Sequence, residues 1–139
     1  MNRGLTYDGS GETMTKIFSV TLDDKPGELA KLTGALGEKG INIKTAAAAT
    51  LGGKGVVNLL TSDESKTRDL LKSQKFSFSE DEALIAKIDD RPGAFAQIAK
   101  NLAAARVNVK GVTLVSTAGT KVEVALTVDN ADKAKTIIK

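Results

Sequence analysis

The residues best suited to chemistry in this chain lie in a five-residue segment that occurs twice. The first copy spans residues 23–27 (DDKPG) and the second spans residues 89–93 (DDRPG). Each copy has carboxylates that can accept hydrogen bonds from an ammonium group, and a glycine that lets a ligand approach the backbone. The Pro-Gly pair also favours a helix start, where unpaired backbone N–H groups attract anions. The segments therefore predict pockets for a small molecule that carries both a positive and a negative group.

Simpler roles for the four aspartates are also open. Asp24 and Asp90 stand where a side chain can cap the following helix. Asp23 and Asp89 can be solvated loop carboxylates. The adjacent acidic pairs could also suggest a metal site or an acid–base couple. Neighbouring side chains at a strand end point apart, however, and no other ligands lie near them in the sequence, so we predict no metal.

The two segments belong to a longer internal repeat with an offset of 89 − 23 = 66 residues. The sequence predicts that this offset continues without a gap as far as Asp63 and Asp129. With this offset, the apolar positions of the predicted helix in one copy align with apolar positions in the other. Residues 41–44 (INIK) likewise align with residues 107–110 (VNVK). A single offset over so many residues indicates two copies of one folding unit.

Composition excludes several classes of function. The 139 residues include no cysteine and no histidine, which removes disulfides, Cys/His zinc sites and imidazole catalysis. Basic and acidic residues are interspersed and the net charge is only +3, so no nucleic-acid surface is indicated. No apolar run approaches the roughly 20 residues of a membrane span, and no signal-peptide core is present. We therefore expect a cytoplasmic protein without a cofactor.

Alternating and helical hydrophobic patterns predict the order strand-helix-strand-strand-helix-strand in the first copy. Its strands are expected at residues 16–22, 41–50, 56–61 and 75–79, and its helices at about 27–39 and 63–72. The second copy is expected to have strands at 83–88, 107–117 and 121–128 and helices at 93–105 and 130–138, with no fourth strand.

This order predicts an α+β fold class of two ferredoxin-like βαββαβ repeats, each a four-stranded antiparallel sheet with two helices on one face. The second repeat lacks its last strand, so its sheet edge is bare, covered by another segment, or missing because the chain is cut short; we favour the last two. The predicted domains are residues 14–80 and 81–139. Residues 1–13, polar and glycine-rich, are expected to be a flexible leader or an appended segment.

The repeated segment, the helix after it and the apolar-Asn-apolar strand start resemble the ACT domain, an amino-acid-sensing module attached to many enzymes of amino-acid metabolism. The resemblance covers about residues 16–139 and occurs in both copies. It implies domains that pair side by side into a continuous sheet, with ligands held between the strand-to-helix loop of one domain and a strand of its neighbour.

In the serine-regulated phosphoglycerate dehydrogenases of this family, the ligand contacts are polar residues before the Pro-Gly and the Asn that opens the second strand. These dehydrogenases have a histidine two positions before the residue that corresponds to Asp24 or Asp90. Leu22 and Ile88 stand at that position here, so the resemblance does not imply specificity for serine. Asn42 and Asn108 can alternatively bond only the turn that precedes them. The candidate ligand-binding residues are Asp24, Lys25, Pro26, Gly27, Asn42, Asp90, Arg91, Pro92, Gly93 and Asn108.

The main functional hypothesis is a non-catalytic regulatory sensor that binds a small molecule, an amino acid, at the interface between paired ACT-like domains. It would act as a homo-oligomer, most simply a dimer, and control an enzyme of amino-acid metabolism. The alternative is a protein-interaction or assembly module that has lost its ligand, which the apolar Leu22 and Ile88 favour. Single-stranded RNA binding on the sheet ranks low, because the third strands, 56–60 and 122–126, contain no aromatic residue on which bases could stack. Catalysis ranks lowest, because no residue cluster argues for it.

Overall fold

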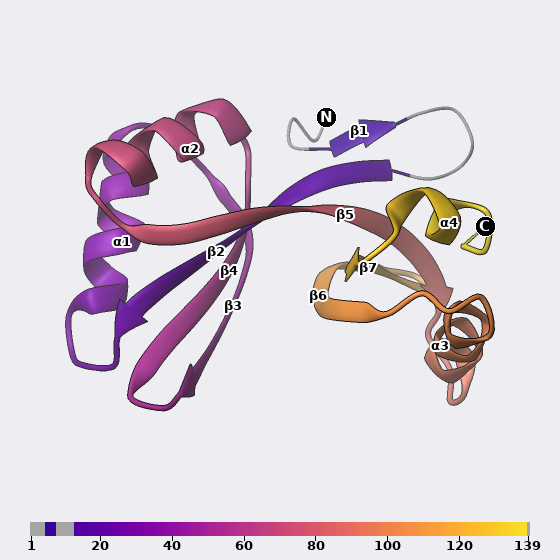
Figure 1. Ribbon diagram of the computed structural model, residues 1–139. Coiled ribbons are helices and arrows are strands. Elements are labelled where there is room, and N and C mark those ends of the chain that lie inside the picture. The colour runs from indigo at the N-terminus through magenta and orange to yellow at the C-terminus, as the bar shows by residue number, and fades with distance from the viewer. Residues whose placement is uncertain (1–4, 8–12, 139) are drawn as a thin grey trace. The chain divides into compact units, whose positions relative to one another are not determined.

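The computed structural model, which describes residues 5–7 and 13–138, has an α+β architecture of antiparallel strands and helices (Figure 1). In chain order the elements are β1 (Leu5–Tyr7), β2 (Thr13–Asp23), α1 (Glu28–Glu38), β3 (Ile43–Leu51), β4 (Lys54–Thr61), α2 (Glu64–Ser73), β5 (Ser77–Asp89), α3 (Ala94–Ala104), β6 (Val109–Ala118), β7 (Lys121–Val128) and α4 (Ala131–Lys135). No helix within the described ranges is both long and apolar enough to cross a membrane.

The chain divides into two compact units that share two long strands. The first unit includes residues 16–81, and the second includes the described residues 5–7, 13–15 and 82–138. The boundaries fall within β2 and β5, so each of these strands contributes to both units. The sequence predicts separate strands at 75–79 and 83–88, but the backbone runs through both as the single strand β5.

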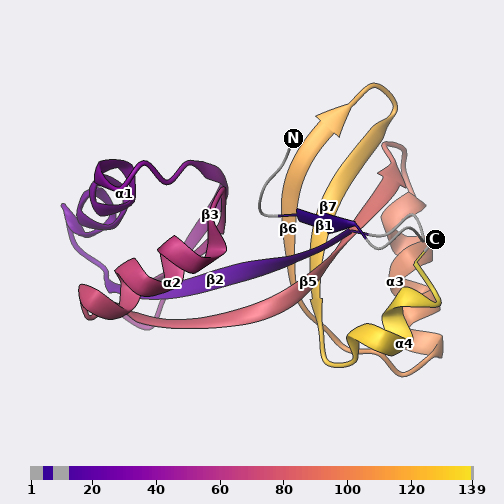
Figure 2. The same cartoon turned by 90° about the horizontal axis from the view of Figure 1, so that it is seen from above.

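In the first unit the strand order is β3-β4-β2-β5, and α1 and α2 lie on one face of the sheet (Figure 1, Figure 2). Alternation in β2 decides which side chains face the helices, because successive side chains of a strand point to opposite faces. Phe18 and Val20 are fully buried and pack with Leu32 and Leu36 of α1. Aliphatic side chains together with Phe18 therefore build this core.

The second unit repeats the same arrangement, with strand order β6-β7-β5. Leu84 and Leu126 are buried in its core, together with Leu102 of α3 and Ala134 of α4. The last helix is shorter than expected, since α4 ends at Lys135 rather than at residue 138.

Residues from the beginning of the chain complete the second unit. In the strand order β2 is the neighbour of β5, and residues 13–15 of β2 belong to the second unit. Met14 packs against the core of that unit. Part of the expected leader, residues 5–7, is the strand β1, which pairs antiparallel with β2. The rest of that leader, residues 1–4 and 8–12, lies outside the described residues. A segment remote in sequence thus supplies the strand that the second copy lacks.

The structural offset between the copies is not 66 residues throughout, which corrects the gapless repeat. Val20 pairs with Val57, whereas Ala86 pairs with Val124, so after the hairpin the offset is 124 − 57 = 67. The extra residue is absorbed by an additional irregularity in β6, between Leu114 and Ser116. A β-bulge places two residues of one strand opposite one residue of its partner. The second copy can therefore carry one extra residue without changing the turns at either end of the strand.

Candidate functional site

The first Pro-Gly corner connects the end of β2 to the start of α1. Gly27 is the N-cap residue of α1, and no side chain makes a capping hydrogen bond there. The helix-cap role considered for Asp24 is therefore wrong. The Asp24 backbone N–H instead donates to the Gly53 carbonyl in the β3–β4 turn, at 3.4 Å. By contrast, a side chain does cap α2, because Asp63 accepts from the Lys66 N–H at 3.0 Å.

The backbone at Gly27 explains why a glycine stands at this corner. Its φ is +92°, a left-handed value that residues with a Cβ rarely adopt. A Cβ built at this position would meet no atom within 4 Å. The corner is therefore open above its backbone and is not plugged by a neighbouring side chain.

A pocket of about 440 Å³ lies beside the first corner. Polar residues form its rim and the apolar side chains of Leu22 and Val57, both buried, form part of its wall. The residues that line it are Leu22, Asp23, Asp24, Lys25, Glu28, Leu29, Ala48, Ala49, Thr50, Gly55 and Val57.

Two of the predicted residues, Asp24 and Lys25, line this pocket. Pro26 and Gly27 are not among its lining residues and instead form the turn that leads into α1. Sequence reasoning missed the opposite wall, residues 48–50. These residues come to the corner because β3 ends there and β4 begins there. Thr50 lies opposite Gly55, and Gly55 lies opposite Leu22. The only sequence signal for them is the glycine-rich hairpin between the two strands.

Asp23 is held by an ion pair across the strand ends. The Lys54 Nζ donates to Asp23 Oδ1 at 2.6 Å. This hydrogen bond and the lysine charge hold the pKa of Asp23 below its usual value, and the carboxylate in turn raises the pKa of Lys54. Both side chains are more than half exposed, so the pair fixes geometry more than it stabilises the fold. In the described part of the chain, no group of three or more acidic side chains is placed to hold a metal ion.

The second corner has the same backbone design. Gly93 is the N-cap residue of α3 with φ +86°, again without a capping side chain. The Asp90 N–H donates to the Thr120 carbonyl at 2.8 Å. Asp89 pairs with Lys121 and, at 3.4 Å, with Arg91, and these two partners lower the pKa of Asp89.

The two corners differ in the first turn of the helix. Glu28 of α1 is replaced in the second copy by Ala94, which is buried, and Leu29 by Phe95. The first corner therefore presents an additional carboxylate to its pocket, and the second does not.

The structure does not bring either predicted asparagine to the corner of its own unit. Asn42 precedes β3 at the opposite end of the sheet, where its N–H donates to Ser62 Oγ at 3.0 Å. The corner end of β4 is at Lys54 and the other end is at Thr61, a separation of about 23 Å at roughly 3.3 Å per residue. Asn108 occupies the equivalent place, and its N–H donates to Asp129 Oδ1 at 3.0 Å.

The fold and the paired corners define a class of regulatory domain. The family model described as "ACT domain pair" matches residues 4–88, more than half of the chain. The chain belongs to this family, which confirms the resemblance seen in the sequence.

Solved structures agree on the fold. Protein BT0572 from Bacteroides thetaiotaomicron is 23% identical, covers 89% of this chain and 85% of its own, and superposes with a TM-score of 0.79. The regulatory subunit of aspartate kinase from Thermus thermophilus, in its ligand-free form, is 16% identical, with coverages of 97% and 94% and a TM-score of 0.63. The aspartokinase alpha and beta subunits are 20% identical, with coverages of 91% and 88% and a TM-score of 0.60. No curated protein matches the chain. At these identities the likeness establishes the ACT fold.

Proposed function

We propose that this protein is a non-catalytic regulatory module of the cytoplasm that binds a free amino acid at the first Pro-Gly corner. The observation that carries the proposal is the pocket of about 440 Å³ beside a helix start that no side chain caps. Exposed helix N-termini favour a carboxylate by about 0.3–1 kcal/mol, and by up to ~2 kcal/mol when partly buried. The α-carboxylate of an amino acid suits this position.

The other end of an amino acid has partners on the same rim. The carboxylates of Asp24 and Glu28 line the pocket and can accept from an α-ammonium group. Leu22 and Leu29 offer apolar surface for a ligand side chain, and Leu29 is 49% exposed before any ligand binds. The second corner has the same backbone but no equivalent of Glu28, so we expect it to bind more weakly.

A second copy of the chain would complete the site. Asn42 and Asn108 are exposed and remote from the corners of their own units, so they can reach a ligand only from a neighbouring domain. We therefore propose a homodimer with ligand at the contact between copies. Because the regulatory subunit of aspartate kinase has a similar structure, an enzyme of amino-acid metabolism is the proposed partner.

A thermal-shift screen over the common amino acids tests the proposal. A ligand at a hundredfold excess over its Kd should stabilise the protein by about 2.7 kcal/mol. Asp24→Asn should reduce that shift, and the matched variant Asp90→Asn, at the equivalent position of the second corner, should reduce it less. A melting curve that no amino acid moves would refute the sensor.

A second candidate function is an assembly module without a ligand, and exposed apolar side chains favour it. Leu51 is 81% exposed at the end of β3, and Val112 and Leu114 of β6 are 45% and 54% exposed. Both strands are terminal in the strand order, and unpaired strand edges pair readily with other chains. Sedimentation of the protein with and without amino acids separates the two functions, because only the sensor requires an assembly that depends on ligand.

A further inference from the structure

A second groove lies in the first unit, on the side of Asp23 and Glu28 that faces the start of β5. It has a volume of about 470 Å³ and shares Leu22, Asp23 and Glu28 with the corner pocket. The remaining walls come from β4, α1 and the turn between α2 and β5. We call it the lysine groove, because Lys31, Lys54 and Lys75 all line it.

The lysine groove combines cationic walls with apolar surface. Leu22 is buried and Phe76 is partly buried against the core of the unit. Lys54 is paired with Asp23 at 2.6 Å, and Lys31 with Glu28 at 3.5 Å. An ammonium group has three N–H donors, so each of these lysines can keep its carboxylate and still donate to a bound anion.

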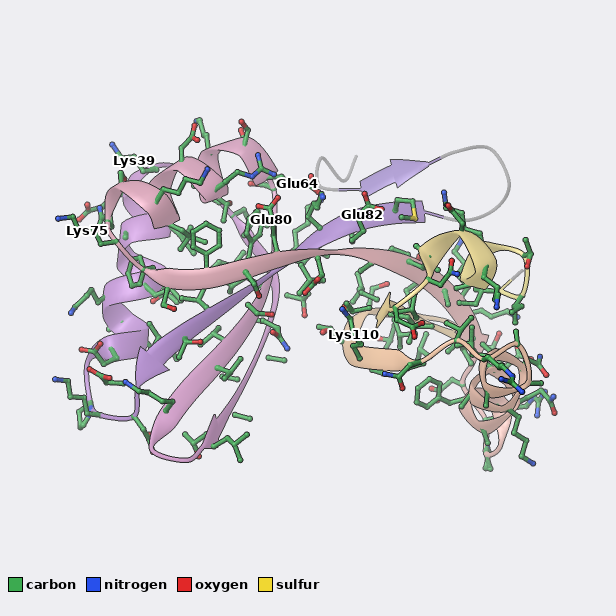
Figure 3. The ribbon with its side chains drawn as sticks, viewed as in Figure 1. Lys39, Glu64, Lys75, Glu80, Glu82 and Lys110 are labelled. Atoms are coloured by element: carbon green, nitrogen blue, oxygen red, sulfur yellow. The ribbon has the colours of Figure 1, made fainter. Side chains whose placement is uncertain are left out.

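Lys75 is the unpaired cation of the groove. It is exposed and makes no ion pair with any residue that the structure describes. The residue lies in the turn that follows α2, from which its side chain extends outward (Figure 3). The groove therefore has one positive charge that no protein group balances.

The backbone of Lys75 has a conformation that glycine adopts more easily than lysine. Lys75 has φ +60°, and the N–H groups of Lys75 and Phe76 donate to the carbonyls of Lys72 and Leu71 at 3.1 and 2.9 Å. This is the Schellman ending of a helix, which strongly prefers glycine at the left-handed position. Gly40 occupies that position after α1. A lysine in its place accepts backbone strain, as Arg106 does after α3.

We propose that the lysine groove binds a small polyanion, either a di- or tricarboxylate or a phosphate ester. Its three ammonium groups come from α1, β4 and the α2–β5 turn, so they suit a ligand with more than one anionic group. Leu22 and Phe76 offer apolar surface to the body of that ligand. The lysine groove shares Leu22, Asp23 and Glu28 with the corner pocket, but its three lysines do not line that pocket.

The test titrates the full chain with citrate, pyrophosphate and phenyl phosphate by calorimetry, against sodium chloride at matched ionic strength. Lys75→Gly should weaken binding about tenfold, the effect of losing one charge-assisted hydrogen bond. The same change should raise Tm by about 2–4 °C, because glycine relieves the left-handed strain. A loss of binding in this variant therefore cannot come from unfolding.

Arg106→Gly is the matched control. Arg106 has φ +62° and ends α3 with the same pair of backbone hydrogen bonds, so its replacement removes an equal charge and relieves equal strain in the second unit. It should raise Tm and leave anion binding unchanged.

The comparison of probes identifies the ligand class. Stronger binding of citrate identifies a polycarboxylate site, and stronger binding of the phosphates identifies a phosphate-ester site.

Three results would overturn the proposal. These are no binding of any probe beyond that of chloride, unchanged binding in Lys75→Gly, or equal weakening in Arg106→Gly. Amide shifts on titration give a second readout, since binding in the groove should move residues 74–77 and not residues 48–50.

Discussion

Replacing Met14 with alanine should loosen the second unit while the first stays intact. Met14 is partly buried and packs against the core of the second unit, although it lies 84 − 14 = 70 residues before Leu84, the first residue of that core. Truncating a fully buried methionine to alanine costs about 2–5 kcal/mol. A partly buried side chain should lose about half of the lower value or somewhat more, so we expect about 1–2 kcal/mol.

Hydrogen exchange measured by mass spectrometry can assign this loss to one unit. A destabilisation of about 1.4 kcal/mol speeds exchange through local opening about tenfold. In Met14→Ala the faster amides should lie in residues 82–89 and 121–128. Ile43→Ala is the matched control, because Ile43 is partly buried against the core of the first unit. Its faster amides should lie in residues 16–23 and 54–61.

The result that refutes the reasoning is equal acceleration in both units for either variant. It would mean that β2 and β5, which both units share, make the whole sheet open as a single cooperative body. A Met14→Ala protein with no change in exchange would show instead that the start of β2 contributes nothing to the second core.

Three further predictions concern stability, measured by denaturant unfolding. Burial lowers the pKa of Lys44, whose Nζ is buried without a hydrogen-bond partner among the described residues, so between the lowered folded pKa and 10.5 the folded state binds fewer protons than the unfolded chain. Stability should therefore rise with pH in the alkaline range, and Lys44→Met should remove that rise and add about 1–2 kcal/mol. Gly27→Ala should cost about 1–2 kcal/mol because φ is +92°, whereas Gly34→Ala, in the exposed part of α1 with open space at its Cβ, should add about 0.5–1 kcal/mol. Two hydrogen bonds from Arg68, of 2.8 and 3.0 Å, lower the pKa of Glu80, so the stability from this pair is present above pH 4.5 and lost as pH falls through the lower folded pKa; Glu80→Gln should flatten this acid dependence.

The sequence was sufficient for features that depend on residues close together in the chain. Alternation in β2 and β7 predicted which side chains enter the cores, and the Pro-Gly segments predicted where α1 and α3 start. The cap at Asp63 can also be predicted from sequence, because a capping side chain accepts a hydrogen bond from an N–H only three residues away. The same local reasoning failed for Asp24, where the left-handed Gly27 is itself the N-cap residue.

Features that depend on pairing between distant strands were decided only by the tertiary structure. The far wall of the corner pocket, residues 48–50, arises from the register of β3 on β4, and the lysine groove gathers side chains from four elements. The change of offset from 66 to 67 is hidden in a bulge of β6, since an inserted residue there leaves the alternation on either side intact. The strand that completes the second unit comes from the start of the chain, which is possible because the entropic cost of closing a loop grows only slowly with its length.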